Sequence, residues 1–187
     1  MVFISWEKVI EEVVNTRKSV RKYRPDPVDR QVLTKVLEVA RKAPSWKNLQ
    51  CWRYILVEGE GTREKLAEAL PSANPARKGI VQAPLTVVLC ANPEESGVSQ
   101  GKEYYLVDAG ITMEHLVLAA AAQGLGTCWV AWFQEEPVKE LLGIPDPYRV
   151  VAMTPLGYPA QEPKEQPRKE LSEIVFSEEW GKRIDFD

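Results

Sequence analysis

The densest charge in the protein is a run of five cations within nine residues near the start of the chain: Arg17, Lys18, Arg21, Lys22 and Arg24. If this segment is extended, Arg17, Ser19 and Arg21 share one face, because successive side chains of a strand point in opposite directions. Two guanidinium groups and a hydroxyl on one face suit a phosphate, since each guanidinium can donate two parallel hydrogen bonds. The competing interpretation is a solvated basic stretch between two helices. A nucleic-acid patch is less favoured, because Tyr23 alone supplies an aromatic ring among these charges.

Other residues that could do chemistry are few. Cys51, Cys90 and Cys128 each lie in an apolar stretch, which is typical of buried, reduced thiols. His115 is the one histidine of the chain and no Cys-x-x-Cys pair occurs, so we expect no metal site. His115 falls inside the longest predicted helix, where an interior or interface histidine is the favoured interpretation. A triad of cysteine, histidine and an acid is a minor alternative.

Composition and charge restrict the class of protein. The chain has 187 residues, 44% of them hydrophobic and 27% charged, as in an ordinary globular protein, and its length favours a single domain. The net charge of −3 argues against a surface built throughout for nucleic acid or anionic lipid. The longest apolar stretch is interrupted by Glu114, His115 and Gln123, so no membrane-spanning helix is expected. Because residues 1–12 lack the pattern of a signal peptide, we expect a cytoplasmic protein.

Hydrophobic periodicity and breakers predict helices that alternate with single strands. The helices are expected at residues 5–16, with Ser5 as N-cap, and at 29–42, 62–70, 102–123 and from 135 onward. The strands are expected at residues 52–57, 84–91, 126–133 and 149–156. Four strands among more numerous helical residues predict an α+β fold with helices on both faces of one sheet.

The end of the chain differs from this pattern. Residues 155–167 are rich in proline and predict an extended connector. Beyond it, Ile174, Val175, Phe176 and Trp180 lie in a short, otherwise polar segment. Apolar side chains of this kind need a surface to pack on, and a second subunit is one such surface.

Four blocks of the sequence, in order, resemble the nitroreductase family. Together they cover nearly the whole chain, which makes chance a poor explanation. The blocks are Arg17-Lys18-Ser19-Val20-Arg21-Lys22-Tyr23 with Pro27-Val28; Ala43-Pro44-Ser45-Trp46-Lys47-Asn48-Leu49-Gln50-Cys51-Trp52; Asp108 to Trp129, ending in Gly124-Leu125-Gly126-Thr127-Cys128-Trp129; and Leu156-Gly157-Tyr158-Pro159-Ala160 through Pro167-Arg168 and Leu171.

The resemblance implies a fold and a cofactor. It implies an α+β domain over residues 1–187 with a central, mostly antiparallel sheet flanked by helices. It also implies a domain-swapped homodimer with FMN at the interface, in which residues 158–187 extend onto the partner subunit. The residues that it implies for FMN binding are Arg17, Lys18, Ser19, Arg21 and Arg168 at the phosphate and ribityl end, Pro44, Ser45, Trp46, Asn48 and Gln50 from the partner subunit, and the backbone of Val130, Ala131 and Trp132 near the ring.

The same resemblance implies an activity. FMN would carry the chemistry without a catalytic side chain, taking hydride from NADH or NADPH and passing reducing equivalents to a nitroaromatic, a quinone or a similar electron-poor acceptor by a ping-pong mechanism. Alternatives are a flavin reductase, a reductive dehalogenase, a flavin-consuming enzyme or, from another class, a flavin-free interaction protein. Asn74 and Lys78 are two candidates for the polar edge of the ring. The chain departs from the family pattern at Trp46, Cys51 and Gln166, and it has Ala131-Trp132 where some relatives carry Glu-Gly, so the acceptor does not follow from the resemblance.

Overall fold

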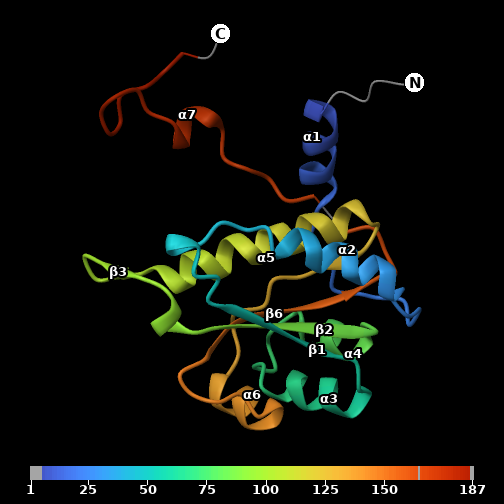
Figure 1. Ribbon diagram of the computed structural model, residues 1–187. Coiled ribbons are helices and arrows are strands. Elements are labelled where there is room, and N and C mark those ends of the chain that lie inside the picture. Colours follow the sequence, from blue (N-terminus) through green and yellow to red (C-terminus); the bar gives the residue numbers. More distant parts are fainter. Residues whose placement is uncertain (1–5, 164, 186–187) are drawn as a thin grey trace.

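A four-stranded antiparallel sheet forms the centre of the protein (Figure 1). The computed structural model describes residues 6–163 and 165–185. The strands are β1 (Trp52–Val57), β2 (Leu85–Ala91), β6 (Arg149–Gly157) and β5 (Gly126–Thr127), adjacent in that order. Every neighbouring pair is antiparallel. The predicted α+β fold with a mostly antiparallel sheet is therefore confirmed.

The two faces of the sheet are both buried, as the sequence of β2 requires. All seven residues of β2 are buried. Leu85, Val87 and Leu89 belong to the core on one face, whereas Val88 and Cys90 belong to the core on the other. Because alternate side chains of a strand point to opposite faces, a continuous apolar run fits only a strand that is covered on both sides.

Helices supply both covers (Figure 1). On one face lie α2 (Arg30–Ala40) and α5 (Tyr104–Ala122), and on the other lie α3 (Glu60–Glu68), α4 (Arg77–Gln82) and α6 (Glu135–Leu142). The start of α2 is fixed by Asp29, whose carboxylate accepts from the amide of Gln31 at 2.7 Å. The sequence predicted α2, α3 and α5 to within two residues at either end and the start of α6 at residue 135, but it did not predict α4.

Helix α5 is the longest helix and the one that organises the site. It is long and apolar enough to cross a membrane by length and composition alone, with a mean hydropathy of 1.3. Its buried residues, among them Met113, Leu116 and Ala120, pack in the core instead, so it is the central helix of the fold. Gly124 follows at φ +72, a backbone conformation that ends helices and that glycine adopts without strain.

Several short elements were not predicted. They are the 3₁₀ turns η1 (Trp46–Asn48) and η2 (Pro93–Glu95), the hairpin of β3 (Val98–Ser99) and β4 (Lys102–Glu103), and the helix α7 (Leu171–Ile174). The strand predicted over residues 126–133 was too long, since β5 ends at Thr127. The amide of Cys128 donates to the Thr154 hydroxyl at 3.0 Å, so the backbone ladder with β6 is interrupted there and resumes only as the isolated bridge between Val130 and Met153.

Both ends of the described chain extend away from this layered body (Figure 1). Helix α1 (Trp6–Thr16) exposes Ile10 and Val14, and the C-terminal segment exposes Leu171, Ile174 and Trp180, the last at 93%. The N-cap predicted at Ser5 lies outside the described residues. Large apolar side chains on both projecting segments leave substantial hydrophobic area in contact with solvent in the single chain.

Candidate functional site

The basic segment is extended, and its alternation is fixed by the sheet. Ser19 forms a parallel bridge with Thr127, and the amide of Val20 donates to the Thr127 carbonyl at 2.8 Å. Val20 is buried, whereas Ser19 and Arg21 are exposed. A Cβ on Gly126 would lie 2.7 Å from the Val20 side chain, so glycine is needed there for the close approach. Ser19 and Arg21 therefore lie on the outer face of an extended segment, as predicted, whereas Arg17 continues the last turn of α1, its amide donating to the Val13 carbonyl at 3.0 Å.

A cavity of about 550 Å³ lies over this segment. It is lined by Arg17, Lys18, Ser19, Val20, Arg21, Gln161, Pro163, Gln166 and Arg168. Arg17 and Arg168, which come from opposite ends of the chain, thus face one space. A second cavity of about 650 Å³ shares Arg17, Lys18 and Val20 with it and continues toward the end of α5.

The charge around the first cavity is uncompensated. Among the residues that the structure describes, Arg17, Lys18, Arg21 and Arg168 form no ion pair with a carboxylate. The Arg168 guanidinium donates to the carbonyls of Gln166 and Pro167 in its own segment, at 3.1 and 3.3 Å. Four cations and a hydroxyl around one cavity therefore suit a ligand group with more than one negative charge, such as a phosphate monoester.

The loop of residues 44–50 forms a second part of the site. Lys47, Asn48 and Gln50 have φ values of 47, 59 and 53, in the left-handed region that few non-glycine residues adopt. Two hydrogen bonds close the loop: the Gln50 amide donates to the Ser45 hydroxyl at 3.0 Å, and the Gln50 side chain donates to the Asn48 carbonyl at 3.1 Å. Pro44 and Asn48 are exposed and can be reached by a ligand; Gln50 is exposed too, but its backbone and side-chain amides already donate within the loop.

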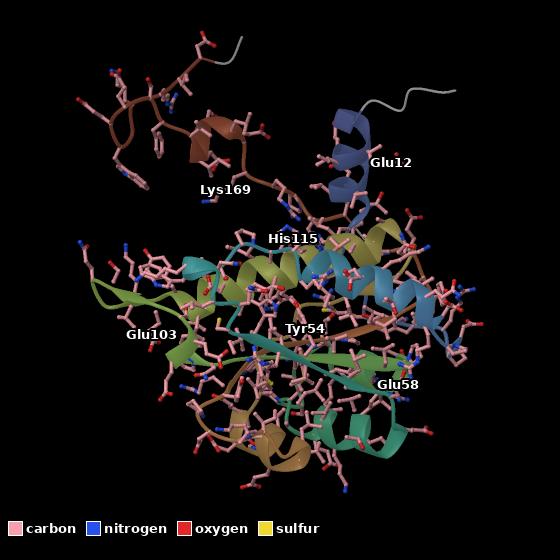
Figure 2. All side chains as sticks on the ribbon, viewed as in Figure 1. Glu12, Tyr54, Glu58, Glu103, His115 and Lys169 are labelled. Atoms are coloured by element: carbon pink, nitrogen blue, oxygen red, sulfur yellow. The ribbon has the colours of Figure 1, made fainter. Side chains whose placement is uncertain are left out.

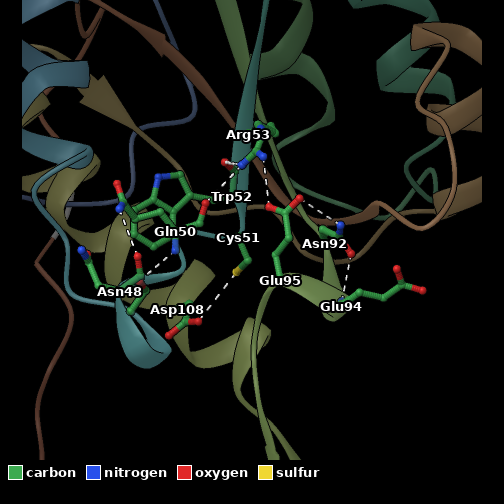
Figure 3. A network of polar contacts seen from close by, with 10 residues as sticks. Asn48, Gln50, Cys51, Trp52, Arg53, Asn92, Glu94, Glu95 and Asp108 are labelled. Carbon is green, nitrogen blue, oxygen red and sulfur yellow. Dashed lines mark hydrogen bonds and ion pairs between the residues drawn. The ribbon is translucent and has the colours of Figure 1, made fainter.

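The loop is held in place by charged residues on other elements (Figure 3). The Trp46 amide donates to the Asp108 carboxylate of α5 at 2.9 Å. On β1, the Arg53 guanidinium donates to the carbonyl of Gln50 at 3.1 Å and pairs with Glu95 at 3.0 Å. Sequence reasoning missed these anchors, because it assigned no role to Asp108 or Arg53.

Trp46 packs within its own chain. Its ring centroid lies 4.6 Å from that of Tyr104 at the start of α5. A Cβ on Gly97 would lie 2.1 Å from the indole, so a glycine is required beneath the ring. Trp46 thereby connects the loop of residues 44–50 to the β3–β4 hairpin.

The segment predicted to offer backbone amides needs one correction. The amide of Val130 donates to the Met153 carbonyl at 2.9 Å, and the Met153 amide returns the bond at the same distance. Val130 is thus unsuited as a donor to a ligand. Ala131 and Trp132 are exposed, and their amides have no acceptor among the described residues.

Asn74 holds the segment of residues 130–132 in place. Its side-chain amide donates to the Trp132 carbonyl at 2.9 Å, and its side-chain oxygen accepts from the Ala76 amide at 2.9 Å. Asn74 is nearly buried, with 9% of its surface exposed. Of the two residues proposed for the polar edge of a ring, Asn74 is therefore already engaged in positioning residue 132.

The remaining reactive groups are unsuited to nucleophilic or metal chemistry. Burial raises the pKa of Cys51 to about 12 and that of Cys90 to about 11, and it also raises the pKa of Cys128. The Nδ1 atom of His115 lies 3.0 Å from the carbonyl of Ile111 on the same helix. Within residues 6–163 and 165–185, no three His, Cys, Asp or Glu side chains are grouped to hold a metal ion.

Comparisons with known proteins agree with this arrangement. The family model described as the nitroreductase family matches residues 14–79 and 72–158. An NADH dehydrogenase from Thermus thermophilus is 30% identical, with 86% of this chain and 91% of the relative aligned. A 5,6-dimethylbenzimidazole synthase from Rhodobacter capsulatus is also 30% identical, covering 80% of this chain and 83% of the relative. The crystal structure of a nitroreductase family protein from Clostridium novyi is 43% identical, with a TM-score of 0.78 and coverage of 93% and 96%.

The fold and the cavity define an α+β protein in which four cationic side chains surround one cavity beside a sheet edge. The chain belongs to the nitroreductase family. Several of its relatives are named as NADH dehydrogenases or NAD(P)H nitroreductases, and these names support an NAD(P)H oxidoreductase enzyme.

Proposed function

We propose that the protein is an FMN-dependent oxidoreductase that works as a homodimer and reduces nitroaromatics, quinones or similar electron-poor acceptors with NADH or NADPH. The observation that carries the proposal is the cavity shared by Arg17, Arg21 and Arg168. A phosphate monoester needs several donors, and this cavity offers three guanidinium groups, the Lys18 ammonium and the Ser19 hydroxyl. The residues present therefore fit the phosphate end of FMN.

When bound, FMN supplies hydride and electron transfer, which no side chain of this site can perform. Arg17, Lys18, Ser19, Arg21 and Arg168 hold the phosphate and orient the cofactor. Pro44, Ser45, Trp46, Asn48 and Gln50 form the loop that contacts the ring and the ribityl chain from the partner subunit. The backbone amides of Ala131 and Trp132 would donate hydrogen bonds to the flavin ring and stabilise negative charge on it. Because these amides are fixed in the backbone, they do so without reorganisation.

The exposed apolar surfaces support the proposed homodimer. Ile10 and Val14 on α1 and Leu171, Ile174 and Trp180 on the C-terminal segment need a cover, and a second copy of the chain provides one. In this arrangement residues 1–187 form one domain, and residues 158–187 extend over the partner. The apolar side chains of both projecting segments then become buried in the dimer.

The proposal is tested first by the absorbance spectrum of the purified protein and by titration with FMN. A flavin spectrum and one FMN per chain are expected; a colourless protein that gains no spectrum with added FMN refutes the proposal and favours a flavin-free interaction protein. Steady-state assays with NADH and NADPH against nitrofurazone, a quinone and free flavin then identify the acceptor. Parallel lines in double-reciprocal plots are expected for the ping-pong scheme. In the cell, we expect the enzyme in the cytoplasm.

A flavin-consuming enzyme is the second candidate, because two relatives carry the name 5,6-dimethylbenzimidazole synthase, at 27% and 30% identity. The two functions differ in the fate of the flavin. Prolonged incubation of the protein with excess FMN and NADH in air, followed by mass spectrometry, separates them. An unchanged total of flavin supports the oxidoreductase, whereas steady loss of flavin with formation of 5,6-dimethylbenzimidazole supports the synthase.

A further inference from the structure

Asp108 is a buried carboxylate at which three separate parts of the chain meet. It lies on α5, and only 2% of its surface is exposed. One of its oxygens accepts from the Trp46 amide at 2.9 Å, and the other accepts from the Ser96 hydroxyl at 2.8 Å. The Cys51 thiol lies 3.7 Å from that second oxygen. Both oxygens are therefore occupied by donors from outside the helix.

Each of these donors belongs to a segment that borders the loop of residues 44–50. Trp46 begins η1, and the first amides of a helical turn have no acceptor within the turn itself. Cys51 directly follows the loop and precedes β1, and Ser96 leads into the β3–β4 hairpin. Asp108 thus binds the loop at its beginning and at its end, and it binds the hairpin on which the Trp46 ring packs.

The loop needs such an anchor because its own conformation is costly. Three of its residues, Lys47, Asn48 and Gln50, have positive φ values, and such conformations persist only where the surroundings determine them. The contacts inside the loop run between Ser45, Asn48 and Gln50. They close the loop on itself without tying it to the body of the protein. The Arg53 bond to the Gln50 carbonyl supports the loop from its exposed side, and Asp108 is its buried attachment.

We propose that Asp108 is a positioning residue for flavin binding: it touches no ligand, but it fixes the loop that presents Pro44, Ser45 and Asn48 to the FMN held by the partner subunit. The inference rests on the proposed function. It predicts that loss of the carboxylate loosens the loop and weakens flavin binding, although the phosphate cavity remains intact.

The test compares Asp108→Ala with the wild-type dimer by two measurements. In flavin-free protein, hydrogen exchange of the peptide that spans residues 45–51 is expected to become about tenfold faster or more, since a hydrogen bond to a charged group is lost. The dissociation constant of FMN, measured by quenching of its fluorescence, is expected to rise by about tenfold for the same reason. Asp108→Asn keeps an oxygen for the Trp46 amide but loses the negative charge, so a smaller change, about three- to fivefold, is expected in both measurements.

Arg63→Met is the matched control. Arg63 is also charged and nearly buried, and it donates to the backbone carbonyls of Glu58 and Pro84. Figure 2 places Glu58 at the opposite end of the molecule from Glu103, which directly precedes the helix that carries Asp108. This variant is expected to lower the melting temperature but to leave loop exchange and FMN affinity within about twofold of wild type.

The outcomes separate the inference from the proposed function. The positioning role is overturned if hydrogen exchange of residues 45–51 in Asp108→Ala is as slow as in wild type. It is also overturned if Asp108→Ala binds FMN as tightly as Arg63→Met does. If the wild-type protein itself binds no FMN, the proposed function fails, whereas the exchange rates still decide whether Asp108 fixes the loop. If Asp108→Ala does not fold, Asp108→Asn decides alone: loop exchange at least threefold faster than in Arg63→Met is expected, and equal rates overturn the inference.

Discussion

Removal of two arginines from opposite ends of the chain is the most direct test of the phosphate site. The double variant Arg17→Ala with Arg168→Ala takes two of the three guanidinium groups from the cavity of about 550 Å³. A hydrogen bond to a charged partner contributes roughly 1.5–3 kcal/mol. Because Arg168 is exposed and the cavity is open to solvent, we take the lower value, about 1.5 kcal/mol for each arginine.

The combined loss of about 3 kcal/mol corresponds to a roughly 100-fold weaker affinity for FMN. Fluorescence titration of the flavin-free protein measures this change, and gel filtration is expected to show that the dimer persists. The matched control is Lys22→Ala with Lys169→Ala, which removes the same charge from the same two segments outside the cavity lining. Its affinity is expected to stay within about threefold of wild type. Stoichiometric flavin in the arginine variant, or equal weakening in the lysine control, would refute the assignment.

Three further predictions concern stability and reactivity. Gly97→Ala places a Cβ 2.1 Å from the Trp46 indole and should destabilise the protein by about 1–3 kcal/mol, seen as a melting temperature lower by roughly 3–10 °C. The hydrogen bond from Arg149 lowers the pKa of Glu135 in the folded protein. The ionised Glu135 therefore contributes its full stabilisation at a pH above its pKa in the unfolded chain, and this stabilisation is lost as the pH falls through its pKa in the folded protein. Glu135→Gln should therefore be less stable than wild type at neutral pH and should lose less stability on acidification in urea titrations. Burial raises the pKa of Cys51 to about 12, so alkylation by iodoacetamide at pH 8 should be slow in the folded protein.

Each of these predictions has its own comparison. For the glycine, Gly61→Ala serves, because no atom lies within 4 Å of the added Cβ; an equal fall in melting temperature would remove the steric argument. For Glu135→Gln, the control is Glu136→Gln, because Glu136 accepts none of the three hydrogen bonds that Glu135 accepts. The same dependence of stability on pH in both variants would contradict the prediction. For the thiol, urea-unfolded protein sets the rate of free reaction, and an equal rate in the folded protein would show that Cys51 is accessible.

Much of the layered body follows from local sequence. The apolar run of β2 and the helical spacing of apolar residues in α2 each indicate which side chains are buried. The boundaries of β1 were also predicted without error. Gly124 and Asp29 mark helix ends because their chemistry satisfies the backbone there. The extended basic segment also followed from alternation. Hydrophobic periodicity depends on which face of each helix or strand is buried, so it was sufficient to predict these elements.

The site required the tertiary structure. Nothing near Asp108 in the sequence indicates that its oxygens accept from the Trp46 amide and the Ser96 hydroxyl, since the three residues meet only when α5 packs beside the loop. The engagement of the Val130 amide by Met153 likewise depends on the pairing of two distant segments. The sequence by itself therefore determined the family, the sheet and the positive charge. Only the folded chain decided which donors stay free and which are used to hold the loops, because hydrogen bonds between distant segments leave no periodic trace in the residues that form them.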